Sequence, residues 1–397
     1  MNVCEITDGI FYVGVNDRTT ELFEGMWPIP DGVTYNSYVV KGEKIALIDT
    51  VELGQTHDFR LKLHNVIGDS KIDYLVVNHM EPDHSGGIPV LMDIYPEMKV
   101  VGNKQTVDMI KGYYKITDDA RFKIIADNEV LDLGGGKELR FVLTPMVHWP
   151  ETMMTYEPST ATLFSGDAFG TFGALNGAVV DSEMDSDFYV TESYRYYSNI
   201  VAKYNKFVLK AFDKIQAAGI TPARLCSTHG PVWEERRQEI LDLTHRLASR
   251  KDEKGVTIVY GSMYGMTAEA AEAMASALAS EGVRTIRVYN ANKMPLSRII
   301  SDAYRYSGLV VCSSTYSMTI LPCVSAFMDA MATREVTDKK VVTIGSFAWA
   351  PVAGKKLKEI SETLGWDVKG SIVMKQALSD ETLAQIKAAA KELAASL

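Results

Sequence analysis

Four side chains that could bind a metal lie within six positions near residue 80. They are His79, Glu81, Asp83 and His84, in the run His-Met-Glu-Pro-Asp-His. This run follows residues 74–77, Tyr-Leu-Val-Val, which are typical of a short buried strand. Burying a charge is expensive unless the charge is paired or bound to a metal. The spacing therefore predicts a metal site at the turn after this strand. The alternative is a solvated acidic loop that caps a helix.

Three more candidate ligands follow predicted strands further along the chain. His148 comes after a strand near residues 141–144, Asp167 ends the strand that begins at residue 162, and His229 follows residues 224–227. A single histidine or a Gly-Asp turn at such a place is usually structural. Strand ends of a layered α/β sheet can bring side chains to one site. The shared position of all these residues therefore favours a single metal centre.

The first half of the chain is predicted to supply short strands and interleaved helices around this centre, which indicates a layered α/β domain. Strands are expected at residues 10–15, 38–40, 45–49, 74–77, 99–102, 122–126, 139–144 and 162–165. Helices are expected at residues 56–66, 90–95 and 107–114, with one long helix over residues 187–218 that carries Tyr194, Tyr196 and Tyr197.

A different pattern begins after a charged linker at residues 251–255. The buried strand 256–260 runs into Gly-Ser-Met-Tyr-Gly-Met-Thr and then into an alanine-rich helix. A strand, a small-residue loop and a helix together form a phosphate cradle, because free backbone N–H groups and the helix dipole face the anion. The loop matches neither a Walker loop nor the Gly-x-Gly-x-x-Gly turn. Strands and helices alternate to the end of the chain, as in a doubly wound sheet.

Composition limits the function classes. A net charge of −10 and a pI near 5.3 argue against nucleic acid as a partner, which needs clustered Lys and Arg. Neither a signal peptide nor a membrane-spanning apolar run is visible. Four scattered cysteines without a C-x-x-C pair argue against a rubredoxin-type iron centre and fit a reducing cytoplasm.

The ligand order resembles the metallo-β-lactamase superfamily, whose fold is an αββα sandwich with a two-metal site. The usual first motif of that superfamily is H-x-H-x-D-H, and Glu81 stands at its second histidine. The carboxylate makes the site harder and favours iron over zinc. H-x-E-x-D-H is the form seen in flavodiiron proteins. The resemblance implies that His79, Glu81 and His148 bind one iron, that Asp83 and His229 bind the other, and that Asp167 bridges them.

The same resemblance implies three residues of the catalytic pocket. His84 is a pocket residue, a proton relay or an occasional ligand. Glu24 stands where several family members carry a histidine that faces the distal pocket. One tyrosine of the predicted long helix, taken as Tyr197, lies near the iron pair.

The second half resembles flavodoxin, so its loops are expected to bind FMN. In that comparison the loop after residue 261 holds the phosphate and two later loops flank the ring, with Tyr316 and Trp349 as stacking candidates. The expected FMN-binding residues are Ser262, Met263, Tyr264, Gly265, Met266, Thr267, Ser314, Thr315, Tyr316, Ser317, Ser346, Phe347, Ala348, Trp349 and Ala350.

We therefore expect an α/β protein with two domains. Residues 1–252 form a metallo-β-lactamase-like αββα sandwich with the iron pair. Residues 253–397 form a flavodoxin-like doubly wound, parallel, five-stranded sheet with FMN. Resemblance to flavodiiron proteins implies reduction of O₂ to water, NO to N₂O, or both.

The resemblance also implies partners. In such proteins the two sites lie on separate domains, so a head-to-tail homodimer, or a dimer of dimers, faces each flavin with the partner's irons. The electron donor is external: rubredoxin, a flavin reductase or reduced F420. Two alternatives remain at this point, a metal-dependent hydrolase and a non-catalytic FMN electron carrier.

Overall fold

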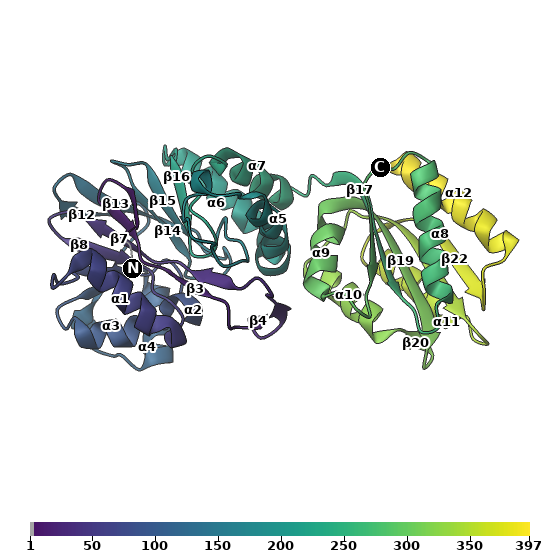
Figure 1. The fold of residues 1–397 in the computed structure, drawn as a ribbon, viewed down its shortest axis with the longest axis horizontal. Helices are drawn as coiled ribbons and strands as arrows, with labels where there is room; N and C mark the ends of the chain where they lie inside the picture. Colours follow the sequence, from purple (N-terminus) through teal and green to yellow (C-terminus); the bar gives the residue numbers. More distant parts are fainter. Residues whose placement is uncertain (1–3) are drawn as a thin grey trace. The chain divides into compact units, whose positions relative to one another are not determined.

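The structure, a computed structural model, describes residues 4–397. The chain divides into two compact units, Met1–Ser249 and Arg250–Leu397 (Figure 1). The domain boundary expected after residue 252 stays a prediction. Within the part of the chain that the structure describes, no helix is long and apolar enough to cross a membrane.

Two β-sheets form the centre of the first unit. The seven-stranded sheet has the order β1 (Cys4–Thr7), β2 (Ile10–Tyr12), β7 (Tyr38–Lys41), β8 (Ile45–Ile48), β9 (Tyr74–Val76), β10 (Lys99–Gly102) and β11 (Phe122–Ile124). The five-stranded sheet has the order β12 (Val130–Gly134), β13 (Lys137–Leu143), β14 (Met153–Glu157), β15 (Thr162–Gly166) and β16 (Arg224–Ser227). Leu47, Leu75 and Phe141 are fully buried, so the hydrophobic core lies on these sheets.

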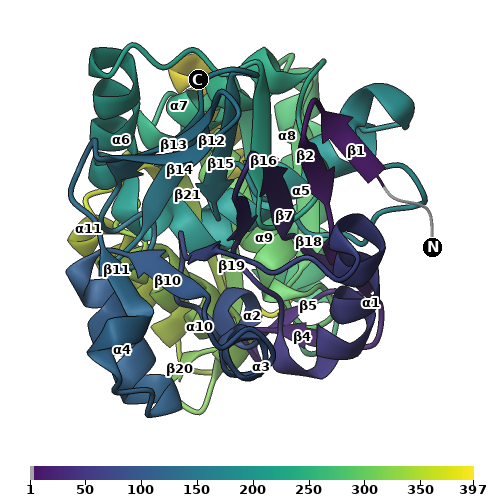
Figure 2. The same cartoon turned by 90° about the vertical axis from the view of Figure 1, so that its left-hand side faces the viewer.

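Helices cover the outer sides of the two sheets, with α1, α3 and α4 on one side and α6 and α7 on the other (Figures 1 and 2). The helices of this unit are α1 (Thr56–Ile67), α2 (Pro82–Ser85), α3 (Ile88–Ile94), α4 (Lys104–Tyr114), α5 (Asp187–Tyr196), α6 (Asn205–Ala217) and α7 (Arg237–Ala248), with 3-10 turns η1 (Leu53–Gln55), η2 (Asp119–Arg121) and η3 (Asp181–Glu183). Two small antiparallel sheets pair β3 (Val15–Asp17) with β6 (Val33–Tyr35) and, between them in the chain, β4 (Leu22–Phe23) with β5 (Trp27–Pro28).

The long helix expected over residues 187–218 is wrong. After α5 the chain forms a π-helix, η4 (Tyr197–Val201), and a 3-10 turn, η5 (Ala202–Tyr204), before α6 begins. The side chains of Ser198 and Asn199 both donate hydrogen bonds to the backbone oxygen of Arg195, at 3.1 and 2.8 Å. Such side-chain bonds compete with the regular backbone ladder of a helix, which gives a local reason for the break.

The second unit is a mainly parallel sheet with helices on both faces. Its order is β18 (Ile286–Asn290), β17 (Glu253–Gly261), β19 (Tyr306–Tyr316), β21 (Lys340–Phe347) and β22 (Asp367–Lys375), and β20 (Thr319–Ile320) pairs with the end of β19. The helices are α8 (Met266–Ser280), α9 (Leu296–Arg305), α10 (Pro322–Thr333), α11 (Val352–Thr363) and α12 (Asp380–Ser396). Residues of α8 and α12 share one buried core with the sheet, and α9 and α10 lie on the other face (Figure 1).

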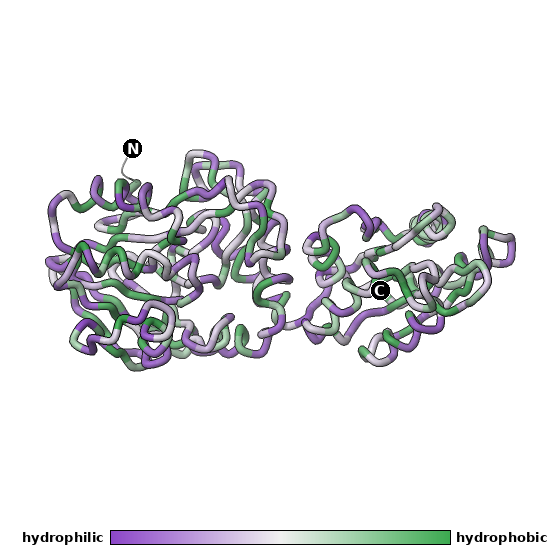
Figure 3. Tube along the Cα trace, turned by 90° about the horizontal axis from the view of Figure 1, so that it is seen from below, coloured by the Kyte–Doolittle hydropathy of each residue, from purple (hydrophilic) through white to green (hydrophobic). Residues whose placement is uncertain are grey.

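Two strands of this unit are longer than the sequence predicts. β17 begins at Glu253, inside the expected linker, because Glu253 already pairs with Tyr306 of β19. β19 continues to Tyr316, into the expected second loop, because it pairs there with β20. Figure 3 shows that hydrophobic stretches run through the interior of each unit and that many of the outer loops are hydrophilic.

Candidate metal centre and flavin site

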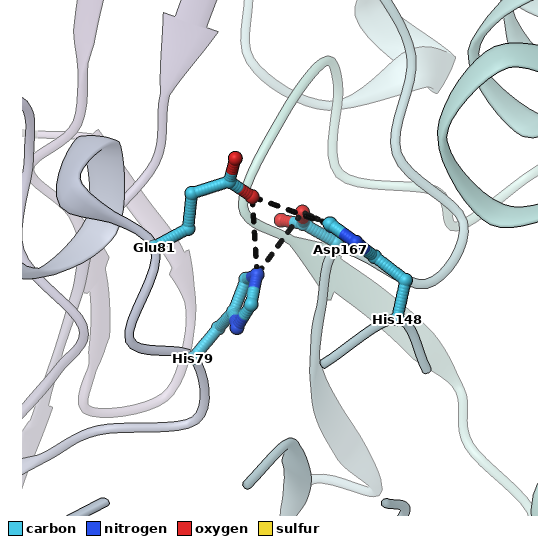
Figure 4. A group of neighbouring side chains, drawn as sticks. All are labelled: His79, Glu81, His148 and Asp167. Carbon is cyan, nitrogen blue, oxygen red and sulfur yellow. Dashed lines mark hydrogen bonds and ion pairs between the residues drawn. The ribbon is translucent and has the colours of Figure 1, made fainter. Parts of the chain in front are cut away.

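Four side chains converge on a first candidate metal position (Figure 4). They are His79, Glu81, His148 and Asp167, from the turns after β9, β13 and β15. The Nε2 atoms of His79 and His148 lie 3.2 and 3.3 Å from Oε2 of Glu81. Nε2 of His148 also lies 3.1 Å from Oδ2 of Asp167, and Nε2 of His79 lies 3.7 Å from that oxygen. The strand ends thus bring residues 88 positions apart in the chain to one point.

A second group, Asp83, His84 and His229, lies beside the first. The Nε2 atoms of His84 and His229 each lie 3.4 Å from one oxygen of Asp83. They also lie 2.9 and 3.7 Å from Oδ1 of Asp167. Asp167 therefore turns Oδ2 toward the first group and Oδ1 toward the second, which is the arrangement of a carboxylate that bridges two metal ions.

The spacing of these atoms fits two metal ions. Bonds of about 2.1 Å to one ion place neighbouring ligand atoms about 3.0–3.4 Å apart, close to the separations found here. Both oxygens of Asp83, both ring nitrogens of His84 and Nε2 of His229 are buried without a hydrogen-bond partner among residues 4–397. Buried polar atoms normally have a partner, so these atoms are suited to ligate ions. Imidazole and carboxylate donors without sulfur suit iron.

The electrostatics of the cluster also favour cations. Burial lowers the pKa of a histidine, but the carboxylates of Asp83 and Asp167 raise the pKa of His84 to about 9. Hydrogen bonds with Asp167 and Glu81 likewise outweigh burial and raise the pKa of His148 to about 9. Burial and the nearby carboxylates raise the pKa of Asp83 to about 7. Three carboxylates in one buried space thus stabilise positive charge, whether it comes from protons or from metal ions.

Residues outside the expected set hold the ligands in place. Glu151 is fully buried, and its Oε1 lies 2.8 Å from Nδ1 of His79 and 2.8 Å from the backbone nitrogen of Met80. Nδ1 of His229 donates to the backbone oxygen of Thr34 at 2.6 Å. Both contacts leave Nε2 free to face the cluster. Glu151 was not among the residues expected from the sequence. Its one signal in the sequence is that it is an acidic residue directly after residues 148–150, His-Trp-Pro.

Two of the three expected pocket residues, His84 and Glu24, are near the candidate ligands. His84 belongs to the second group described above. Glu24 sits at the tip of the β4–β5 hairpin with a left-handed φ of 51°, and Nε1 of Trp27 donates to its carboxylate at 3.1 Å. Burial and the Glu81 carboxylate raise the pKa of Glu24, which places its carboxyl group within the electrostatic reach of the cluster.

The structure does not bring the hydroxyl of Tyr197 to the cluster. That hydroxyl donates to Oδ1 of Asn205 at 2.6 Å. Tyr196 is the tyrosine that faces the metal residues, since its ring centroid lies 5.5 Å from that of His229. Burial and the carboxylate of Asp167 raise the pKa of Tyr196 well above its ordinary value. Neighbouring helical residues point about 100° apart, so the periodicity of the sequence alone does not distinguish the two.

The first flavin loop has the features of a phosphate cradle. Gly265 precedes α8 with φ of 102°, and an added Cβ there would meet no atom within 4 Å. The hydroxyl of Ser262 accepts a hydrogen bond from the backbone of Gly265 at 3.1 Å. The start of α8, at Met266 and Thr267, therefore offers backbone N–H groups to an anion.

The later loops lie at the same edge of the sheet. The hydroxyls of Thr267 and Ser346 are 2.8 Å apart, and Ser314 pairs with Ser346 across neighbouring strands. The hydroxyl of Ser314 is buried without a hydrogen-bond partner among residues 4–397. Large side chains around this edge are exposed, including Tyr264 (83%) and Trp349 (88%). Polar atoms and open aromatic rings at one edge fit a phosphate-bearing, planar cofactor.

The other expected flavin residues lie in these same loops. Thr315 and Tyr316 end β19, and Ser317 lies in the turn before β20. Phe347 ends β21, and Ala348 and Ala350 lie in the loop before α11. Met263 lies between Ser262 and Tyr264 and is 43% exposed.

Comparisons with known proteins assign both halves. A family model described as ODP family beta lactamase matches residues 33–230, and a flavodoxin model matches residues 258–391. The chain is 29% identical to the anaerobic nitric oxide reductase flavorubredoxin of Escherichia coli (strain UTI89), over 98% of this chain and 81% of the relative.

Solved structures give the same result. The structure resembles the rubredoxin oxygen:oxidoreductase of Desulfovibrio gigas, with a TM-score of 0.94 and 27% identity over 100% of this chain and 98% of that one. It resembles the flavodiiron protein of Giardia intestinalis with a TM-score of 0.93 and 25% identity, over 100% and 96% of the two chains. Given the order of the two matched halves and these relatives, the chain belongs to the flavodiiron proteins.

Proposed function

We propose that this oxidoreductase reduces O₂ to water, NO to N₂O, or both. The observation that carries the proposal is the pair of ligand groups that Asp167 joins, in a chain that also carries flavin loops. The named relatives include a nitric oxide reductase and an oxygen oxidoreductase. Both gases therefore belong to the proposal.

Each group of ligands would hold one of two iron ions. His79, Glu81 and His148 would bind the first iron, and Asp83 and His229 the second, with Asp167 between them. We also assign His84 to the second iron, because its ring nitrogens lack hydrogen bonds while Nε2 lies near oxygens of Asp83 and Asp167. FMN would lie on the loops after β17, β19 and β21.

When bound, FMN and the iron pair supply the electrons and the adjacent metal positions that a diatomic substrate needs. The protein's own residues do the rest. Asp167 sets the separation of the two positions. The rings of Phe23, Phe172 and Tyr196 pack together beside His229 and exclude water from that side. Tyr196, whose pKa lies well above its ordinary value, keeps its phenol proton near the cluster, and burial raises the pKa of Glu24 in the same region.

A second copy of the chain completes the proposal. Exposed apolar side chains lie near both sites: Leu22 and Met26 on the hairpin that carries Glu24, and Met263 and Met318 on the flavin loops. Such surface patches are typical of interfaces. We propose a head-to-tail homodimer, alone or paired into a tetramer, in which each flavin faces the partner's irons.

The remaining partners are also proposals. The electron donor is an external rubredoxin, flavin reductase or reduced F420, and the protein works in the cytoplasm. All four cysteines are free, which fits a reducing compartment.

The test is anaerobic turnover of each gas with a chemical reductant feeding the FMN. We expect loss of O₂, NO or both, with two irons and one FMN per chain by elemental and absorption analysis. A protein that holds both cofactors and consumes neither gas would overturn the proposal. Two zinc ions with hydrolysis of a thioester or phosphodiester would support the hydrolase alternative instead.

A further inference from the structure

An apolar cavity lies beside the candidate metal ligands in the first unit. Its walls include Val147, Ala168 and Phe169, Val201 of the π-helix, and Val208 and Ala211 of α6. The space open to the centre of a water-sized sphere is about 20 Å³. This is about the space that one water-sized molecule needs.

Two residues of the cavity wall are chain neighbours of candidate metal ligands. Val147 directly precedes His148 in the chain, and Ala168 directly follows Asp167. These wall residues are nearly fully buried, at 3% and 6% exposure. A molecule in the cavity would therefore contact residues that directly adjoin two candidate ligands in the chain.

The lining excludes water on chemical grounds. Of the eleven side chains in the wall, only Tyr197 and Thr244 carry polar groups, and the hydroxyl of Tyr197 is taken by Asn205. A buried water needs two to four polar partners, and cavities that are empty of water in proteins are apolar. The cavity therefore suits a small apolar molecule.

The irregular helix builds this wall. Tyr197 and Val201 are the first and last residues of η4, and both line the cavity. A π-helical turn changes which side chains face a neighbouring layer, and such turns occur often at functional sites. Phe212 of α6 also lines the cavity but is partly exposed, and its ring packs edge-on against Phe169 at 6.0 Å. Phe212 thus stands between the cavity and solvent.

We propose that this cavity is a binding site for the diatomic gas on its way to the metal centre. The proposal rests on the proposed function, which makes O₂ or NO the substrate. Both are small molecules of low polarity and can enter an apolar cavity. A plain packing gap would bind the same probes but would not affect how the enzyme uses its substrate. The two tests below separate these explanations.

The first test asks whether the cavity binds a gas. The protein with its iron and FMN is placed under xenon pressure and measured by crystallography or by ¹²⁹Xe NMR. We expect xenon among Val147, Ala168 and Val208, and we expect Ala211→Phe to remove it. An empty cavity in the unsubstituted protein would overturn the proposal.

The second test asks whether the gas uses the cavity. Ala211→Leu and Val208→Phe are two independent ways to fill it. We expect kcat/KM for O₂ or NO to fall at least severalfold, because the gas loses its binding place, while iron content, FMN content and reduction of the flavin stay as before. Ala248→Leu is the matched control, a buried alanine of α7 outside the wall.

Unchanged kcat/KM in a filled variant that no longer binds xenon would overturn the role of the cavity in turnover. Xenon binding in a protein that reduces neither gas would overturn the proposed function and the identity of the substrate. That result would leave the gas site itself in place, so the two failures are distinguishable.

Discussion

Glu151 shows how a residue outside the ligand set controls the metal centre. Its Oε1 lies 2.8 Å from Nδ1 of His79, so a proton on Nδ1 leaves Nε2 of that ring to face the cluster. The same oxygen accepts the backbone N–H of Met80, and Oε2 has no hydrogen-bond partner among residues 4–397. The negative charge of Glu151 therefore acts mainly on the loop that carries His79.

Glu151→Gln keeps the size of the side chain and removes its charge. We expect the first iron to be bound about 10–100-fold more weakly, the usual cost of losing such a partner. Iron release to a chelator measures this. Glu157→Gln is the control, because Glu157 is equally buried at the end of β14 but accepts hydrogen bonds from Ser159 and Thr160. Equal iron retention in the two variants would contradict the role of Glu151.

His84 is the residue whose role the motif left open. We expect His84→Ala to weaken binding of the second iron at least tenfold. Loss of a side chain that binds the metal directly should weaken binding at least as much as loss of a residue that only supports a ligand. ⁵⁷Fe Mössbauer spectra and iron titration measure the loss. His57→Ala, an exposed histidine of α1, is the control. If the variant binds both irons as tightly as the unsubstituted protein does, then His84 is a pocket residue rather than a ligand.

At the scale of elements, Asp17 anchors the segment that leads into the β4–β5 hairpin. Asp17 ends β3 and is nearly fully buried. It accepts hydrogen bonds from the backbone and hydroxyl groups of both Thr19 and Thr20, at 2.7–3.1 Å. Burial alone would raise the pKa of Asp17, but these hydrogen bonds hold it below its ordinary value.

Asp17→Asn should lower the free energy of unfolding by about 1–3 kcal/mol near pH 7, because an amide nitrogen cannot accept the bonds that one carboxylate oxygen takes. A lowered folded-state pKa gives stability that is present above the unfolded pKa, near 3.9, and is lost as pH falls through the folded value. The gap between the two proteins should therefore shrink below about pH 4. Denaturant unfolding at several pH values measures this, and a gap that does not change with pH would contradict it.

At the scale of the whole molecule, the metal and flavin sites lie on separate compact units. In the proposed head-to-tail dimer, electrons cross between subunits. A chain with a defective metal site should therefore be rescued by a partner chain whose defect is in the flavin site.

We expect a metal-defective Asp167→Ala chain and a flavin-loop-defective chain to be inactive alone and active when co-expressed. Random pairing makes about half of the dimers mixed. Each mixed dimer has one intact flavin facing one intact iron site, whereas an unsubstituted dimer has two such pairs. Activity should therefore reach about a quarter of that of the unsubstituted protein. If electrons moved only within one chain, the mixture would stay inactive, since neither chain carries both working sites.

Much of the fold could be predicted because local signals were strong. The metal run follows a buried strand at β9, as expected. The flavin loops lie at strand ends because small residues interrupt a regular βα alternation. The long helix over residues 187–218 was wrong. Side-chain hydrogen bonds to the backbone oxygen of Arg195 give a local reason for its break, and the hydrophobic periodicity of the sequence does not reveal such bonds.

The residue types in the sequence were enough to indicate the chemical kind of the site. The types of the candidate ligands, with Glu81 among them, favour iron over zinc because ligand type selects the metal, and the resemblance to flavodiiron proteins implies two ions. Tertiary structure alone decided which atoms meet. It turned the two oxygens of Asp167 to different groups, placed Glu151 behind His79, chose Tyr196 over Tyr197, and opened the apolar cavity beside Val147. These features depend on side-chain directions between segments far apart in the chain, and the pattern of neighbouring residues does not contain that information.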